Sequence, residues 1–405
     1  MASQHLTREL QRLTEEAQSA PDELSMMIQY CFPHGSIPPG TAEVHLADAS
    51  EEVVLRPAFT RAGRFEAIPE PSLSDEDAQT LIKVIGELEG GRTPTVWRVV
   101  LFASLPVKGT FRYRDRWQIR PVPDDAPKPS FAMAPHPFVL EVKGSAVSEG
   151  FVRWLQGGKL LREAELVLSL VLHGGLAPDR STSPSHEWVV LPGWEYSEDR
   201  PSPTSLLAQA SYFMPTMPGR GDDFSDVAEV EPMRLVPDEE YFGRLGTSVY
   251  QTLELPASLA ALLDAVDALQ PGDRDRFFRS AYWFSRAGGA WRLSQSLSYI
   301  CLINAIEVLT PHGVEDRCPT CGLNRAPGPT ARFRDFVERY AGDVPDRSRL
   351  YAIRSRLVHG DQILQSDQPS GFAFTPHLWE ERERHDRARR VAQTAVINWA
   401  ITHGN

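Results

Sequence analysis

The sequence predicts an α+β protein in which an N-terminal mixed α/β domain precedes an all-helical bundle. The chain has 405 residues, of which 41% are hydrophobic. This length exceeds what one hydrophobic core usually supports, since single cores stop growing near ~250–300 residues. Short strand-like runs occupy the first part of the chain, whereas apolar residues later recur at helical spacing. We therefore predict an N-terminal domain over residues 1–240 and a helical bundle over 241–405.

Strands are predicted where apolar runs or alternating patterns occur in the N-terminal domain. The run 96–105 is mostly apolar, and 111–120 alternates aromatic or aliphatic residues with arginines. A turn at Lys108-Gly109 would join these two strands as a hairpin. Further elements are predicted at 51–55, 138–142 and 188–191 as strands and 160–172 as a helix, followed by a long Pro-, Gly- and Ser-rich connector over 192–238.

Six helices are predicted in the bundle. Pro271-Gly272 and Gly288-Gly289 are expected to separate the first three helices. In the last helix an apolar stripe recurs every three or four residues, from Ala388 to Trp399. The predicted helices are 257–269, 273–286, 291–309, 331–340, 346–359 and 377–401.

The charge is distributed unevenly between the two predicted domains. The net charge of −12 argues against a protein that coats nucleic acid through its overall positive field. Residues 255–405 contain 19 Arg, no Lys and 17 Asp plus Glu, a net charge of +2, so the acidity belongs to the N-terminal part. No apolar run reaches the ~18–20 residues of a membrane span, and no signal peptide is recognised. We expect a cytoplasmic protein with no membrane association.

One segment combines residues suited to RNA cleavage without a metal. Arg354 and His359 precede Gly360, a residue type that often follows a helix C-terminus. Imidazole can move protons between the ribose 2′-OH, the phosphate and the leaving oxygen, while a guanidinium stabilises charge on the phosphate. Residues five apart on a helix lie about 140° apart, so His359 should sit at the helix end, or the two residues should meet across a partner chain. An alternative is that Arg354 pairs with a bundle carboxylate and His359 only ends the helix.

Residues 255–405 resemble the HEPN superfamily, most closely its ApeA-like branch. The similar features are Phe277–Arg286, Ala305–Leu309, a CPxCG loop and Ile353–Gly360 leading to a terminal helix. The family's Arg, polar residue and His match Arg354, Ser355 and His359, although Asn, Asp or His is more usual than Ser at the polar position. The resemblance implies a dimeric, metal-independent endoribonuclease with a toxin-like or antiviral role.

Two polar residues in an apolar helix are candidate supporting residues. Asn304 and Glu307 lie about one turn apart in the predicted helix 291–309, where a polar or ionisable group is costly unless paired. They would orient Arg354 or His359, or else cap a helix or pair with structural arginines.

An incomplete set of zinc ligands is recognised in the sequence. Cys318 and Cys321 have the spacing of a zinc knuckle, and His312 is a candidate third ligand. A closed site needs four ligands, so two chains would share one zinc ion or the pair would be a remnant. Cys301 lies in an apolar helix and is predicted to be core. Such a zinc ion would be structural, and catalysis would need no cofactor.

The arginine row of the 111–120 strand leaves a different function open. Arg112, Arg114, Arg116 and Arg120 are predicted to share one face, which could follow an RNA backbone or simply be solvated. The main hypothesis is a HEPN ribonuclease that cleaves RNA as a homodimer. The alternatives are a non-catalytic HEPN dimerisation or binding module, and an RNA-binding sensor with a structural bundle.

Overall fold

The computed structural model describes residues 75–123, 136–147, 150–172, 220–227, 229–243, 252–291, 293–311, 327–368 and 376–404, with Leu176 and short pieces before residue 75. The chain packs as two compact units that alternate along the sequence. One comprises Met1–Trp97, Val142–Arg162 and Gly219–Phe224, and the other comprises Arg98–Glu141, Glu163–Pro218 and Ser225–Asn405. The domain boundary near residue 240 remains a prediction.

The predicted α+β class is confirmed. The main sheet has the strand order β6-β7-β8-β5-β9, and its pairs β6–β7 and β5–β9 are antiparallel. The strands are β5 (Thr93–Ala103), β6 (Phe111–Tyr113), β7 (Trp117–Pro121), β8 (His136–Ala146) and β9 (Arg220–Gly221). The predicted strand 138–142 is thus confirmed as part of β8, and the predicted strand 96–105 is confirmed by β5, which starts earlier and ends at Ala103. The predicted strand 188–191 lies outside the described residues.

The first unit also contains small antiparallel pairs, β1 (Val44–Ala47) with β2 (Glu52–Leu55) and β3 (Ala58–Phe59) with β4 (Phe65–Ala67). The helix α3 (Asp75–Gly90) was not anticipated from the sequence, and α4 (Gly150–Val171) is longer than the predicted 160–172. Gly157 of α4 lies against the Trp97 indole, where any Cβ would collide. This glycine therefore permits the close approach of helix and strand in that unit.

The hairpin prediction at Lys108-Gly109 is wrong. The neighbours of β5 are β8 and β9, and the hairpin instead joins β6 to β7 through a tight turn at Arg114, whose φ is +50°. Gly109 has a φ of +82°, and a Cβ there would meet the Glu231 carbonyl oxygen at 2.7 Å. Thr110 donates its N–H to that same oxygen at 2.8 Å, so the backbone after β5 is paired with the 231–233 segment.

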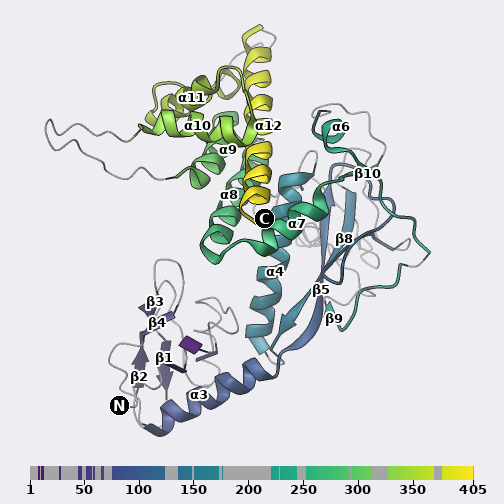
Figure 1. The fold of residues 1–405 in the computed structure, drawn as a ribbon, viewed down its shortest axis with the longest axis vertical. Helices are drawn as coiled ribbons and strands as arrows, with labels where there is room; N and C mark the ends of the chain where they lie inside the picture. The colour runs from purple at the N-terminus through teal and green to yellow at the C-terminus, as the bar shows by residue number, and fades with distance from the viewer. Residues whose placement is uncertain are drawn as a thin grey trace, which may run out of the picture. The chain divides into compact units, whose positions relative to one another are not determined.

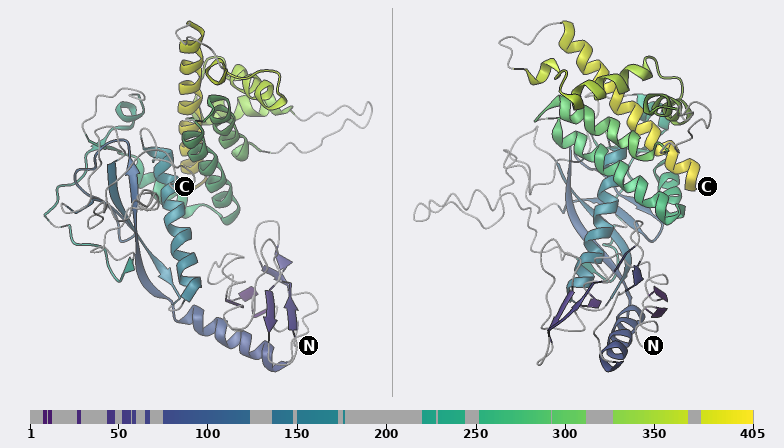
Figure 2. Two further views of the ribbon diagram at one scale, coloured as in Figure 1. Left: turned by 180° about the vertical axis from the view of Figure 1, so that it is seen from behind. Right: turned by 90° about the vertical axis from the view of Figure 1, so that its left-hand side faces the viewer.

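The six predicted bundle helices are confirmed, with shifted ends. In all three views of Figures 1 and 2, α8 to α12 lie together, with the long α12 running beside α8 and α9. Short elements precede them, namely β10 (Leu235–Val236), α6 (Asp238–Gly243) and β11 (Leu255–Pro256), the last pairing in parallel with β10. The bundle helices are α7 (Leu259–Ala268), α8 (Pro271–Ala290), α9 (Gln295–Leu309), α10 (Pro329–Ala341), α11 (Arg347–His359) and α12 (Pro376–Gly404).

The predicted helix break at Gly288-Gly289 is wrong, because α8 continues through both glycines to Ala290. Glycine lowers helix propensity by only about 1 kcal/mol, which packing can offset. The break is set instead by Ser294, whose side chain accepts the Leu297 N–H at 3.1 Å as the N-cap of α9. Asp367, in the short 3₁₀ helix η2 (Gln365–Asp367), adds acceptors for the N–H groups of Gln295 and Ser296, each at 2.8 Å.

Apolar side chains of α8 to α12 fill the bundle core. The predicted stripe of α12 is confirmed, with Ala388, Ala392, Ala395 and Val396 fully buried and Trp399 2% exposed. α9 is buried along most of its length, and Asn304 and Glu307 are the partly buried polar residues of its second half. Among the described residues, no helix is long and apolar enough to cross a membrane.

Candidate functional site

The helix α11 positions the two residues of the motif. It ends at His359, as predicted, because Gly360 adopts a left-handed conformation with a φ of +78°. The N–H of Asp361 then donates to the Arg356 carbonyl at 2.9 Å, which satisfies one of the terminal carbonyls. The His359 side chain is exposed and makes no hydrogen bond with the part of the chain that is described.

Arg354 is held by Asn304 and Glu307 of α9. Its Nη2 lies 2.7 Å from the Glu307 Oε2, and a longer contact of 3.4 Å reaches the Asn304 Oδ1. Asn304 and Glu307 therefore contact Arg354, one of the two residues that they were predicted to orient. The alternative in which Arg354 pairs with a bundle carboxylate predicts the same contact with Glu307.

Tyr351 completes the cluster and was missed in the sequence. Its hydroxyl donates to the Glu307 Oε1 at 3.1 Å, so one carboxylate holds both Tyr351 and Arg354. Burial, together with the nearby Glu307 charge, raises the pKa of the Tyr351 hydroxyl, which favours the neutral donor form. The spacing Tyr351 to Arg354, one helical turn, was the available sequence signal.

The Arg354 guanidinium is only partly used by these contacts. Its side chain is 23% exposed, and both polar contacts go to Nη2. The Nε is buried without a hydrogen-bond partner, and Nη1 has none among the described residues. Arg354 therefore combines a fixed position with a terminal nitrogen, Nη1, that forms no hydrogen bond with a described residue, while its Nε is shielded by burial.

The other motif residues do not form one cluster within a single chain. Ser355 is partly buried and makes no hydrogen bond with a described residue. On a regular helix, Arg354 and His359 are separated by a rise of about 7.5 Å and a rotation of about 140°. The two side chains consequently leave α11 in different directions.

The proposed zinc ligands Cys318, Cys321 and His312 lie outside the described residues. Within the described ranges, no three His, Cys, Asp or Glu side chains gather as a metal site would require. Cys301 is buried as predicted, and its burial raises the pKa of the thiol.

The arginines of the predicted row form ion pairs with carboxylates of the second unit. The turn at Arg114 means that these residues do not share one face of a continuous strand, which corrects the prediction. Arg114 pairs with Asp264 of α7 at 2.6 Å, and Arg116 pairs with Asp267 of the same helix. The remaining pairs are Arg112 with Asp115 at 3.3 Å and Arg120 with Glu141 at 3.1 Å.

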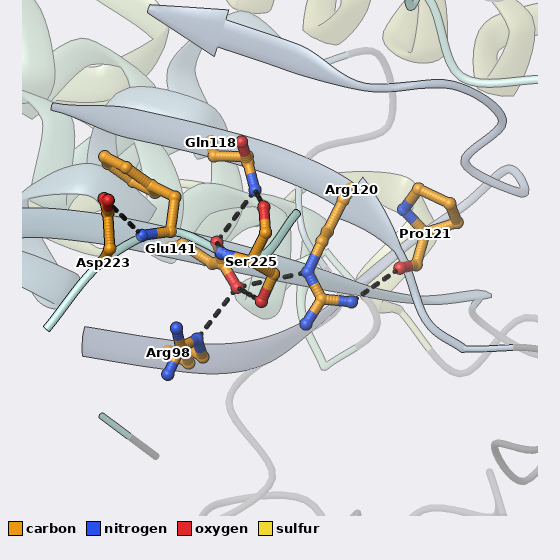
Figure 3. Close-up of polar contacts among 8 residues, drawn as sticks. Arg98, Gln118, Arg120, Pro121, Glu141, Asp223 and Ser225 are labelled. Atoms are coloured by element: carbon orange, nitrogen blue, oxygen red, sulfur yellow. Dashed lines mark hydrogen bonds and ion pairs between the residues drawn. The ribbon is translucent and has the colours of Figure 1, made fainter. Parts of the chain in front are cut away.

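A second carboxylate cluster lies on the sheet around Glu141 of β8 (Figure 3). Glu141 is fully buried, and its Oε1 lies 2.9 Å from the Arg98 Nε and 3.1 Å from the Arg120 Nε. Its Oε2 accepts the Gln118 amide and the Ser225 N–H, each at 2.9 Å. Burial pushes the pKa of Glu141 upward, but the Ser225 hydrogen bonds and the arginine charges outweigh it and lower the pKa. A lone glutamate inside the apolar run 138–142 was the sequence signal for this buried charge.

No family model, curated protein or solved structure matches the chain. The resemblance to the HEPN superfamily stays a prediction from the sequence motifs.

Proposed function

We propose that this protein is a metal-independent endoribonuclease of the HEPN type. The observation that carries the proposal is Arg354, which Glu307 and Tyr351 hold in place while part of its guanidinium keeps unused donors. Catalytic cations are typically positioned in this way before substrate binds, because a preorganised donor needs no rearrangement during the reaction.

In the proposed reaction the 2′-OH of the ribose attacks the adjacent phosphorus and the 5′-oxygen leaves. His359 transfers protons, and Arg354 stabilises the charge that develops on the phosphate. Glu307 positions Arg354 without touching the substrate, while Ser355 occupies the polar position of the motif. The products are a 2′,3′-cyclic phosphate and a 5′-hydroxyl, and the proton removed from the 2′-OH is balanced by one delivered to the leaving oxygen.

A homodimer completes the proposed site. Because Arg354 and His359 point in different directions from α11, a pair from two chains would form one composite cleft. Exposed apolar side chains around the start of α9 and the end of α11 support such an interface, since large apolar groups in water favour association. They are Leu293, Leu297, Val358 and Ile363, exposed by 85%, 47%, 48% and 53% respectively.

Cellular role and zinc content are proposed from the family resemblance and the CxxC spacing alone. The proposed role is a toxin-like or antiviral function in the cytoplasm. The proposed zinc ion is structural, bound by Cys318 and Cys321 with further ligands from His312 or a second chain. Catalysis would proceed in EDTA, because the nucleophile is the 2′-OH.

The non-catalytic alternative is a HEPN module that binds a partner through the same bundle. The ion pair of Arg354 with Glu307 is also expected under this alternative, because a counter-charge stabilises a half-buried arginine in either role. The RNA-binding sensor has less support, since the arginines of its proposed surface are paired with Asp264, Asp267 and Glu141.

The deciding experiment uses the purified full chain and a single-stranded RNA. Arg354→Ala and His359→Ala should each lower the cleavage rate by about 10²–10⁴-fold, the usual size of losing a charge-stabilising or proton-transfer group. Arg334→Ala, on the exposed face of α10, serves as the control. DNA, which lacks the 2′-OH, should not be cut, and cleavage that requires Mg²⁺ would contradict the proposal. A monomer at all concentrations in light scattering would contradict a cleft formed by two chains.

A further inference from the structure

Arg332 of α10 is a partly buried arginine that no acidic side chain of the described residues contacts. Its Nε is buried without a hydrogen-bond partner, and no described residue forms an ion pair with it. The neighbouring arginines differ, because Arg334 contacts Asp335 at 3.6 Å and Arg347 pairs with Glu338 at 2.8 Å. A half-buried guanidinium with unsatisfied donors is costly unless something compensates its charge.

The position of Arg332 follows from the residue beside it. The ring of Phe333 packs against the ring of Tyr351 with centroids 5.1 Å apart, which fixes the start of α10 against α11. The Arg354 guanidinium carbon lies 5.9 Å from the centroid of the same Tyr351 ring. Burial and Glu307 raise the pKa of the Tyr351 hydroxyl, whereas the charges of Arg354 and Arg332 oppose them. Tyr351 is therefore within electrostatic reach of both arginines.

The charges in this cluster do not balance. Arg332 and Arg354 are both cationic, while Glu307 is the only carboxylate that contacts either of them among the described residues. The buried Nε of each arginine is shielded from a ligand, but Nη1 of Arg354 and both Nη atoms of Arg332 form no hydrogen bond with a described residue. In a partly desolvated setting, an excess positive charge with open donors favours an anion with several oxygen acceptors. A phosphodiester has this chemistry.

We propose that Arg332 is a second phosphate-binding residue, which holds a backbone phosphate of the RNA while Arg354 acts at the scissile one. The inference rests on the proposed ribonuclease function and extends its site from α11 to the first turn of α10. Arg332 contributes to substrate binding, whereas the proton transfers remain with His359.

The binding test uses the full chain carrying His359→Ala, so that RNA is not consumed. A fluorescent single-stranded oligonucleotide is titrated by anisotropy at several salt concentrations, with Arg332→Ala, Arg332→Lys and the control Arg334→Ala. Arg332→Ala should weaken binding about 5- to 30-fold, the range for one charge-assisted contact. It should also reduce the slope of log K against log salt by about 0.7, the value for one phosphate contact on a single strand. Arg332→Lys should restore part of the affinity, and Arg334→Ala should change it less than about twofold.

Kinetics and melting separate a binding role from a structural one. In the chain with His359 intact, Arg332→Ala should raise KM by more than it lowers kcat. Its melting temperature should stay within about 2 °C of the parent, since no described ion pair is lost. A clear drop in melting temperature, or an RNA affinity equal to that of Arg334→Ala, overturns the inference.

The two proposals fail in different ways. If Arg354→Ala abolishes cleavage while Arg332→Ala behaves like Arg334→Ala, the ribonuclease function stands and Arg332 is not a phosphate ligand. If the parent protein neither binds nor cleaves RNA, the ribonuclease proposal fails, and the role of Arg332 fails with it.

Discussion

Glu141 pairs with two arginines and Glu307 pairs with one, and the two glutamates do so in different surroundings. Glu141 on the sheet is fully buried, and both of its oxygens accept several donors. Glu307 in the bundle is 27% exposed, and its Arg354 partner keeps donors unused. A charge cluster that is buried and satisfied mainly stabilises one conformation, whereas an incompletely satisfied one at the surface can receive a ligand.

The same contrast separates two histidines of the bundle. His359 ends α11 and is exposed. His385 of α12 is 3% exposed, lies 2.9 Å from the Ser298 Oγ and packs its ring on Trp291. Ser298 donates its hydroxyl proton to the Ala287 carbonyl, so the His385 Nε2 must carry a proton and donate it to the Ser298 oxygen. Burial lowers the pKa of His385 and keeps the ring neutral. Of the two, only His359 is placed to exchange protons with a substrate.

The largest effect on stability is expected from Glu141→Gln. This change leaves Arg98 and Arg120, 8% and 11% exposed, without their shared counter-charge, and should lower the free energy of unfolding by about 3–5 kcal/mol. Urea unfolding at pH 7 measures it, and Glu380→Gln on the exposed pair with Arg384 is the control, with an expected change below about 0.5 kcal/mol. A cost for Glu141→Gln as small as that of the control would refute the contrast between the clusters.

Acid should destabilise the protein through His385. Burial lowers the pKa of His385 from 6.5 to about 3, so the folded chain keeps it neutral while the unfolded chain takes up a proton below pH 6.5. Stability is therefore lost as the pH falls from 6.5 towards 3, by up to about 1.4 kcal/mol for each pH unit from this group. Glu141, whose pKa in the folded chain is below its ordinary 4.5, adds a further loss once the pH falls below about 4.5, because the unfolded carboxylate then takes up a proton first.

His385→Gln tests this assignment, because a glutamine amide can also donate to the Ser298 Oγ and does not titrate. Urea midpoints measured between pH 7 and pH 5 should depend less on pH in this variant than in the parent. An unchanged pH dependence would show that the proton uptake belongs to other groups.

Glu307→Gln should affect activity more than stability. The substituted amide carries no charge, so Arg354 would lose its ion pair but could still donate to the amide oxygen and to the Asn304 oxygen. We expect a loss of about 1 kcal/mol or less in unfolding free energy, and a roughly tenfold loss in cleavage rate from poorer positioning. Asn304→Ala, which removes the longer contact alone, should give a smaller rate loss. If Glu307→Gln instead loses several kcal/mol of unfolding free energy, the role of Glu307 is mainly structural, like that of Glu141.

The smallest effect is expected at Ser355. Replacing it with Asn, the more usual residue of the family resemblance, keeps a hydrogen-bonding group on a partly buried surface of α11. Cleavage should rise or fall by no more than about fivefold, which corresponds to about 1 kcal/mol. A loss as large as that of His359→Ala would mean that the serine hydroxyl itself takes part in the reaction.

Local patterns in the sequence determined the helices of the bundle and the end of α11. Apolar spacing predicted all six helices, and Gly360 predicted that α11 stops at His359, because these features depend on residues within a few positions of one another. The tertiary structure decided the partners. Glu307 meets Arg354 from a different helix, and Arg120 meets Glu141 from a different strand, so the pairing depends on how helices and strands pack. The same holds for Arg332, because only the packing of α10 shows that no acidic side chain of the described residues contacts it.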